Sequence, residues 1–184
     1  MRSVAVDSVV LSERQDLTEA VFELLQDQWP IHAETRRRSL SPSPNEERVL
    51  LLTSTCDTGL DHGVVAHAQL KWPQPHVCLV VSVVVHRAHR RQHVGETLMA
   101  AVDARIRASN RTNGPVTTYV WTADQEAFFE RVGYRTCAPF DGRHRAVARL
   151  DQVQQHNLSS LLQRRSAADD NSRLDVTWLS KTLV

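Results

Sequence analysis

Residues 86–96 carry a concentration of groups that can bind an anion, because three histidines and three arginines lie within this stretch. The stretch joins a β-branched apolar run to an amphipathic one, as a turn that feeds a helix would. The first turn of a helix leaves backbone N–H groups without intrahelical partners and holds the positive end of the helix dipole. Arg90 and Arg91 add charge there, and Gly95 permits close approach of the backbone to a ligand. These features predict a phosphate or pyrophosphate site; a solvated strand–helix loop is the alternative that the residues alone leave open.

Apolar periodicity predicts a mixed α/β domain that would position this turn. The β-branched run at 77–86 predicts a strand buried on both faces, and residues 94–106 repeat an apolar side chain every four positions, as an amphipathic helix does. Further strands are expected at 3–11, 49–52, 63–70, 116–122, 134–139 and 143–150, and further helices after the capping boxes at Ser12 and Thr122 and at 31–40. The domain is expected to span residues 1–150. Residues 151–184 are polar and are expected to form a largely disordered tail, in which residues 174–179 could dock on the domain.

The charge balance narrows the classes of partner. The chain has 184 residues with 22 basic and 21 acidic side chains, a formal net charge of +1, which excludes a globally basic nucleic-acid binder and an acidic solvating chain. The basic run at 86–93 could still contact RNA, but aromatic stacking platforms are scarce there. We therefore expect no nucleic-acid partner. Twenty of the basic residues are arginine, which forms bidentate contacts with carboxylates and phosphates.

Signals of a membrane or secreted protein are missing from the sequence. No apolar run approaches the roughly 20 residues that span a bilayer, and Asp7 interrupts the apolar run that a signal peptide would need. Cys56, Cys78 and Cys137 are too few and too widely spaced to indicate a disulfide framework or a zinc site. We expect a cytoplasmic protein with no membrane partner and no metal.

Two motifs resemble those of the GNAT acetyltransferase superfamily. Val-Val-Val-x-x-x-x-Arg-x-x-x-x-Gly at 83–95 is similar to the family's acetyl-CoA-binding segment, and Asp-Gln-Glu-Ala-Phe-Phe-Glu-Arg-Val-Gly-Tyr at 124–134 is similar to a segment that follows it in the family. The resemblance covers residues 3–150 and implies a GNAT-type mixed, mainly antiparallel central sheet of about seven strands flanked by about four helices. It also implies acetyl-CoA as cosubstrate.

The same resemblance implies roles for individual residues. Backbone groups of Val83 and Val85 would contact the pantetheine arm and the acetyl carbonyl, amides at 91–96 would hold the pyrophosphate, and Asp124 would lie near the pantetheine arm. The full set implied for cofactor binding is Val83, Val84, Val85, Arg90, Arg91, Gln92, His93, Val94, Gly95, Glu96, Asp124 and Phe129.

A narrower resemblance is to the actin N-terminal acetyltransferases, the NatH type. It rests on Leu-Leu-Gln-Asp-Gln-Trp-Pro at 24–30, followed by Arg36 and Ser39, and on Thr-x-Asp-Gln at 122–125. It implies acetyl transfer to the N-terminal amine of a protein with an acidic N-terminus, processed actin, with profilin as a possible further partner. Converging arginines can select such termini. From the residues alone, Trp29 could instead be a core aromatic and residues 36–38 a solvated helix face. The expected substrate-binding residues are Trp29, Arg36, Arg37, Arg38 and Ser39.

The expected reaction is direct attack of the substrate α-amine on the acetyl thioester. An α-amine pKa of about 7.7–8.0 leaves a neutral fraction at cytosolic pH, so the demand on a base is small. His93 stands where the family motif prefers Gly, and Phe129 stands where many members have the Tyr that protonates the departing thiolate. Ser82 and His86 are therefore the candidate catalytic groups, although His86 could be a surface histidine beside the arginines. A GNAT enzyme for a small amine and an acetyl-CoA-binding module with weakened catalysis are the alternative functions.

Overall fold

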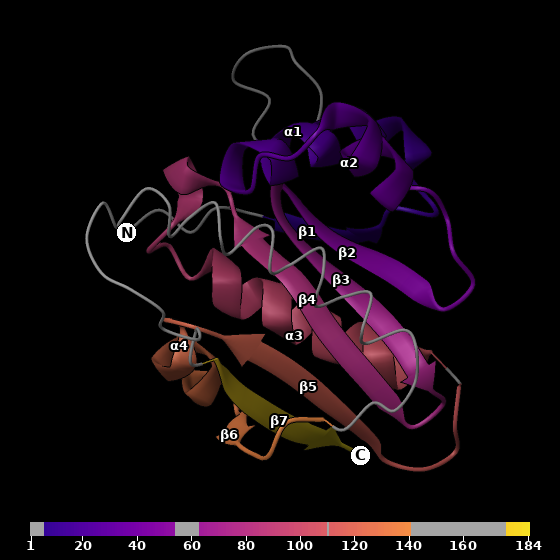
Figure 1. Cartoon of the computed structure of the whole chain (residues 1–184), viewed down its shortest axis with the longest axis vertical. Helices are drawn as coiled ribbons and strands as arrows, with labels where there is room; N and C mark the ends of the chain where they lie inside the picture. The colour runs from indigo at the N-terminus through magenta and orange to yellow at the C-terminus, as the bar shows by residue number, and fades with distance from the viewer. Residues whose placement is uncertain (1–5, 54–62, 110, 141–175) are drawn as a thin grey trace.

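A computed structural model describes residues 6–53, 63–109, 111–140 and 176–184 (Figure 1). The strands are β1 (Val6–Val10), β2 (Glu46–Thr53), β3 (Val64–Gln74), β4 (Val77–Val85), β5 (Val116–Thr122), β6 (Arg135–Thr136) and β7 (Thr177–Leu183). The α-helices are α1 (Thr18–Gln28), α2 (Ala33–Ser39), α3 (Val94–Ala108) and α4 (Glu126–Arg131). Two short 3-10 helices, η1 (Gln15–Leu17) and η2 (Arg87–His89), precede α1 and α3. No helix within these described ranges is both long enough and apolar enough to cross a membrane.

All seven strands belong to one sheet with the order β1-β2-β3-β4-β5-β7-β6. Neighbouring strands are antiparallel except β4 and β5, which are parallel. A parallel pair needs a crossover connection, and α3 provides it between these two strands. The expected mixed, mainly antiparallel sheet with flanking helices is thus confirmed.

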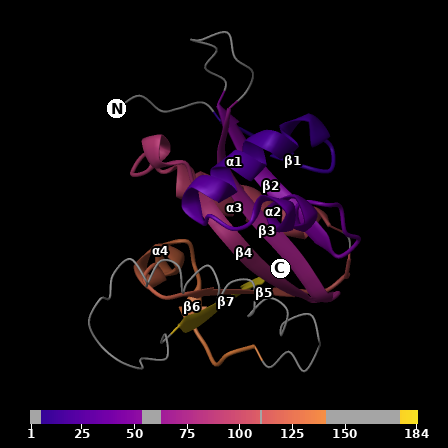
Figure 2. The ribbon, with the colours of Figure 1, turned by 45° about the horizontal axis from the view of Figure 1, so that its top comes forward.

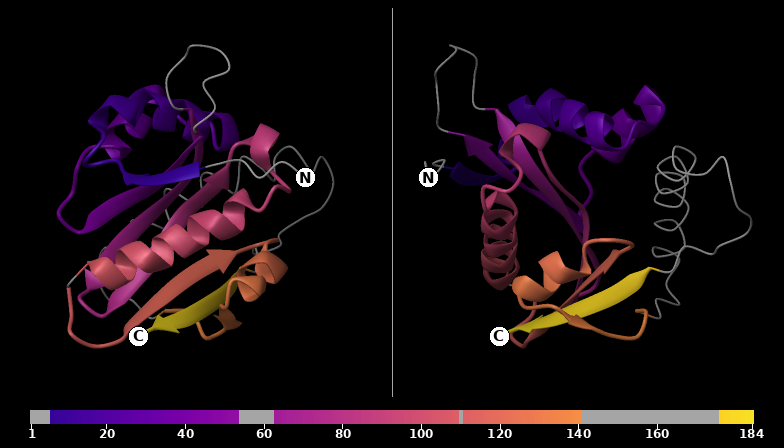
Figure 3. Two further views of the ribbon diagram at one scale, coloured as in Figure 1. Left: turned by 180° about the vertical axis from the view of Figure 1, so that it is seen from behind. Right: turned by 90° about the vertical axis from the view of Figure 1, so that its left-hand side faces the viewer.

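The sheet separates two apolar layers. On one face, α3 lies across the sheet (Figure 3). Its side chains Leu98, Val102 and Ile106 belong to the core on that face, so the predicted four-residue repeat is the buried face of this helix. On the other face, Val21 and Leu24 of α1 pack with side chains of β2 and β4. The helices α1 and α2 cover the half of the sheet formed by β1–β4, whereas α4 packs beside β7 (Figures 1 and 2). The two halves meet at β4 and β5.

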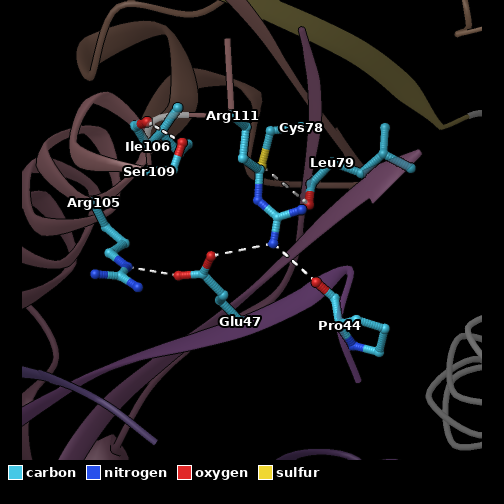
Figure 4. A network of polar contacts seen from close by, with 8 residues as sticks. All are labelled: Pro44, Glu47, Cys78, Leu79, Arg105, Ile106, Ser109 and Arg111. Carbon is cyan, nitrogen blue, oxygen red and sulfur yellow. Dashed lines mark hydrogen bonds and ion pairs between the residues drawn. The ribbon is translucent and has the colours of Figure 1, made fainter. Parts of the chain in front are cut away.

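A polar network fixes the C-terminal end of α3 to β2. Glu47 accepts a hydrogen bond from Arg105 Nε at 2.6 Å and lies 3.6 Å from Arg111 Nη2, which donates to the Pro44 carbonyl at 3.0 Å (Figure 4). The N-terminal end of α3 lies at the turn that follows β4.

The C-terminal strand corrects the expected domain boundary. Residues 151–184 were expected to lie outside the domain, yet β7 is inserted between β5 and β6 and pairs with β5 over its full length. The strand expected at 134–139 is reduced to β6, whose partner among the described strands is β7. Residues 143–150 and the rest of the expected tail up to residue 175 lie outside the described residues. β7 belongs to the sheet because Leu179 and Leu183 are buried in its core.

The strands β4 and β5 separate along their length. Their described pairing ends at Leu79 and Tyr119, although β4 continues to Val85 and β5 to Thr122. On the side of β5, the backbone groups of β4 beyond Leu79 therefore face an opening, whereas on the other side β4 stays paired with β3. This opening holds a cavity.

Candidate active site

A cavity of about 740 Å³ lies where β4 and β5 separate. Residues 80–85 of β4 form one wall, because their edge is not covered by β5. Residues 121–125 and α4 form the opposite wall, and the turn before α3 lies at one end. The site residues brought together here from the predicted set are Trp29, Ser82, Val83, Val84, Val85, Arg90, Arg91, His93, Gly95, Glu96, Asp124 and Phe129.

The β4 wall contains a β-bulge. Between the register pairs His67/Val84 and Gln69/Val81, β4 has one residue more than β3. Ser82 within it has a φ of 52°, in the left-handed region. A non-glycine residue in that region costs on the order of 1–3 kcal/mol, so contacts around the bulge must hold it. Ser82 also lines the cavity, so it stays a candidate for proton transfer.

The turn into α3 has the backbone conformation that a glycine-rich turn would adopt. Arg91 and His93 both have a φ of 60°. His93 is the N-cap of α3, and its Nδ1 lies 3.0 Å from Glu96 Oε2. The left-handed conformation explains in physical terms why this position favours glycine. Because the imidazole is exposed and turns toward Glu96, the turn tolerates His93 without a backbone change.

Gly95 lines the cavity, and its lack of a side chain also matters for the packing of α3 on α4. A Cβ at this position would lie 3.1 Å from Cε2 and 3.3 Å from Cζ of Phe128. Gly95 therefore makes room for a side chain of α4, and the ring of Phe128 closes that part of the cavity wall. Phe129 beside it is buried and makes edge-to-face contacts with Phe128 and Tyr134.

Arg90 is held by protein groups on both sides. Its Nε donates to the Val85 carbonyl at 3.0 Å, and its Nη2 donates to Oε1 of Gln28. Gln28 and Trp29 lie at the C-terminal end of α1, and Gln28 precedes Arg90 by 62 residues in the sequence. Arg90 thus joins the turn expected to bind the cofactor to the segment that carries the expected substrate anchor, Trp29.

Several predicted residues lie outside the cavity. Val94 is buried in the core under α3, and the Gln92 amide donates to the Ala88 carbonyl at 2.9 Å. His86 caps η2, where its Nδ1 accepts from the Ala88 amide at 3.3 Å. Because His86 caps η2 and does not line the cavity, its position does not support the predicted catalytic role. Burial and the neighbouring His86 lower the pKa of His89.

The arginines of α2 do not lie where the predicted substrate site requires them. Arg36 is only 5% exposed; its Nη2 donates to the carbonyls of Trp29 and Leu25, and burial lowers its pKa. The prediction of a substrate contact is wrong for Arg36, because the helical period turns it inward toward α1. Arg37 pairs with Glu19 at 3.0 Å. Neither Arg37 nor its neighbours Arg38 and Ser39 line the β4–β5 cavity.

Other cavity residues were missed by the sequence analysis. Arg131 contributes a cation at the end of α4, and its guanidinium lies 6.0 Å from the centre of the Phe128 ring. Trp121 lines the cavity and stacks on Trp178 of β7, with ring centres 5.0 Å apart. The capping box at Thr122 pointed to this region, and the Thr122 hydroxyl accepts from the Gln125 amide at 3.0 Å. The further missed residues are Gln28, Val80, Val81, Thr122, Ala123, Gln125, Phe128 and Val176.

The donor set of the cavity suits an anionic, organic ligand. Among the described residues, no group of three or more histidine, cysteine, aspartate or glutamate side chains is arranged to hold a metal ion. Arg90, Arg91 and Arg131 supply positive charge, and the edge of β4 that β5 leaves uncovered supplies backbone donors and acceptors. An elongated ligand with a phosphate at one end and amide groups along its length fits these features.

Comparisons with known proteins agree with the fold. The profile of the acetyltransferase (GNAT) domain family matches residues 55–136. N-alpha-acetyltransferase 80 of Mus musculus is 34% identical over 133 residues, which are 70% of this chain and 41% of the mouse protein. The chain therefore spans about two fifths of the length of that relative.

Solved structures show the same arrangement of strands and helices. A GNAT-family acetyltransferase from Staphylococcus aureus aligns with a TM-score of 0.61 and 12% identity, covering 98% of this chain and 100% of the other. The ribosomal-protein-S18-alanine N-acetyltransferase from Escherichia coli aligns with a TM-score of 0.58 and 12% identity, covering 97% and 93% of the two chains. The motifs, the separated strands and the family profile agree, and residues 55–136 of this chain match an acetyltransferase domain of the GNAT superfamily.

Proposed function

We propose that this chain is an N-α-acetyltransferase that moves the acetyl group of acetyl-CoA to the N-terminal amine of a protein with an acidic N-terminus. Processed actin is the substrate that the resemblance to the NatH type suggests. The single observation that carries the acetyltransferase part is the separation of β4 and β5 beside a bulged wall and the turn into α3. The similarity to the mouse N-alpha-acetyltransferase supports a protein substrate.

The cavity residues fit acetyl-CoA, which GNAT acetyltransferases use as cosubstrate. The free amides of the turn before α3 and the N-terminal end of this helix would hold the pyrophosphate, with Arg91 adding charge. The uncovered edge of β4 at 83–85 would hydrogen-bond the amide groups of the pantetheine arm, as an added strand would. Acetyl-CoA, when bound, supplies the acetyl thioester that the substrate amine attacks.

Charge and shape at the open end of the cavity support an acidic peptide. Trp29 lines the cavity and packs on the apolar layer under α1, and its carbonyl accepts a hydrogen bond from the buried Arg36, which holds the backbone of Trp29 in place. Arg131 is an exposed cation in the same cavity. Glu96 and Asp124 also line the cavity, but the arginines Arg90, Arg91 and Arg131 outnumber these two carboxylates, whereas a small cationic amine would favour an acidic pocket.

The chemistry required of the protein is modest. The C–N bond forms as the C–S bond breaks, and the proton lost by the amine leaves with the CoA thiol. A thiol pKa near about 8.5 makes the thiolate an acceptable leaving group, and no tyrosine is among the described residues that line the cavity. We assign the proton relay to the Ser82 hydroxyl and water, with positioning as the main source of rate.

Mass spectrometry of acetyl transfer tests the proposal. The purified chain is incubated with acetyl-CoA and peptides that begin Asp-Asp-Asp, Glu-Glu-Glu, Met-Leu or Ser-Gly, with an actin–profilin complex as the folded substrate. We expect transfer to the acidic peptides above all. Transfer confined to the other peptides or to small amines would refute the acidic specificity, and binding of acetyl-CoA without any transfer would indicate a binding module.

Arg131→Glu and Arg91→Glu separate the two anionic ligands. If Arg131 contacts the peptide, its reversal raises KM for acidic peptides about tenfold or more while leaving KM for acetyl-CoA nearly unchanged. Arg91→Glu, in the turn before α3, should raise KM for acetyl-CoA instead. Arg135→Glu, an exposed arginine on β6 that does not line the cavity, is the matched control.

A further inference from the structure

A buried histidine stands directly behind the bulged wall of the cavity. His67 of β3 is fully buried, and its register partner on β2 is Leu50, which belongs to the apolar layer under α1. It does not line the cavity, and no sequence motif pointed to it. Polar side chains are rarely buried without a specific partner, so this position calls for an explanation.

The partner of His67 is the carbonyl of the bulge residue. Nδ1 of His67 lies 2.9 Å from the Ser82 carbonyl oxygen. In the bulge, Ser82 and Val83 together face the single residue Ala68, so the regular ladder of hydrogen bonds is interrupted. Because a carbonyl can only accept, the ring must carry its proton on Nδ1. His67 thus replaces the ladder hydrogen bond that the bulge removes.

The surroundings of His67 keep its ring neutral and keep the proton on Nδ1. Burial, above all, lowers the pKa of His67 to about 3; the hydrogen bond to the Ser82 carbonyl acts in the opposite direction, and the cations of Arg48 and Arg36 add to the effect of burial. These two buried guanidinium groups face the ring from β2 and α2. The ring therefore stays neutral and in the Nδ1–H tautomer, and His67 Nε2 has no hydrogen-bond partner within the described part of the chain.

We propose that His67 is a positioning residue, which holds Ser82 in its left-handed conformation and thereby shapes the β4 wall that binds acetyl-CoA. It touches neither ligand and acts only through the Ser82 carbonyl. Without this donor, the strained residue relaxes toward regular strand geometry and the extra residue of β4 shifts within the wall at 82–85. The expected effect on acetyl-CoA binding and on kcat rests on the proposed function, whereas the effect of His67 on the conformation of Ser82 does not.

A matched pair of variants tests the role. His67→Asn places the amide Nδ2 close to the former Nδ1 and keeps a donor, whereas His67→Leu has nearly the same size and has none. We expect His67→Leu to weaken acetyl-CoA binding about tenfold or more in calorimetry, to lower kcat, and to speed amide exchange at 82–85. His67→Asn should recover most of each loss. General destabilisation predicts the opposite order, because leucine suits an apolar layer better than asparagine does.

The wild-type chain provides a measurement that needs no variant. Ring-nitrogen NMR should show His67 as the neutral Nδ1–H tautomer with no titration between pH 5 and 8. The Nε2–H tautomer, titration in this range, or equal acetyl-CoA binding by folded His67→Leu and His67→Asn would overturn the proposal. If the wild type fails to bind or use acetyl-CoA, the proposed function fails, while the tautomer and the exchange at 82–85 still decide the role of His67.

Discussion

Arg90 and Gln28 are joined by a hydrogen bond, although 62 residues separate them in the sequence. Arg90 also donates to the Val85 carbonyl, so one guanidinium connects the end of α1, the end of β4 and the turn before α3. A bound phosphate would lie close to this connection. The geometry therefore couples the cofactor end of the cavity to the segment that carries Trp29.

Arg90→Met removes these donors and keeps most of the aliphatic stem. Because hydrogen bonds from a charged group are lost to both neighbouring segments, KM for acetyl-CoA and KM for an acidic peptide should each rise about tenfold. Initial-rate kinetics with both substrates varied measures the two effects. Arg87→Met, which removes a charge from η2 outside the cavity, should change neither KM by more than about twofold. A rise in KM for acetyl-CoA alone would reduce Arg90 to a phosphate contact.

Gly95→Ala tests the contact between α3 and α4. The added Cβ would lie 3.1 Å from Phe128 Cε2, so the ring must shift and open the cavity wall. We expect kcat/KM for acetyl-CoA to fall about tenfold, and Gly95→Ala combined with Phe128→Leu to be less impaired than the two single effects predict. Gly114→Ala is the control, because its Cβ would have no neighbour nearer than 3.8 Å. Additive effects would show that Phe128 is not the obstacle.

Arg36→Met distinguishes a structural arginine from a substrate contact. Loss of its hydrogen bonds to the carbonyls of Trp29 and Leu25 should lower the free energy of unfolding by about 1–3 kcal/mol in urea titrations. The exposed neighbour variant Arg38→Met should stay within about 0.5 kcal/mol of the wild type. Unchanged stability together with a raised KM for acidic peptides would restore the substrate role of Arg36.

His67 gives the fold a specific dependence on pH. Its pKa is about 3 in the folded chain and about 6.5 in an unfolded one, so the unfolded state binds the proton more readily. Stability from this group is complete above pH of about 6.5 and is lost as pH falls toward 3, with a slope of up to about 1.4 kcal/mol per pH unit. Urea titrations between pH 7 and 5 should therefore show a steeper decline for the wild type than for His67→Asn. Parallel declines would mean that His67 does not stay neutral in the fold.

Removal of β7 tests where the domain ends. A chain that stops at residue 176 loses the strand that pairs with β5 and β6, the Trp178 ring that stacks on Trp121, and the ion pair between Lys181 and Asp103. These losses should exceed the total stability of a domain of this size, about 5–15 kcal/mol, so circular dichroism should show no cooperative thermal transition. A cooperative transition at the wild-type temperature would support a domain that ends near residue 150.

By itself the sequence determined the elements whose signals are local. The β-branched run that forms β4, the four-residue repeat of α3 and the place of the turn between them follow from side chains within one short stretch. The position of His93 could also be interpreted, because a left-handed residue at a helix start is a property of the local backbone. The motifs at 83–95 and 124–134 placed these elements in the correct family.

Only the tertiary structure decided which residues meet. Periodicity could not show that Arg36 turns inward to the Trp29 carbonyl, since the same α2 pattern suits a solvated face. β7 pairs with a strand that precedes it by more than fifty residues, and pairing over that separation leaves no local signal. His67 and Ser82 are both unremarkable in sequence, yet the bulge brings a donor to a carbonyl that the ladder leaves without its regular partner. Backbone hydrogen bonds between distant segments, which depend on register rather than on neighbouring residues, gave the cavity its shape.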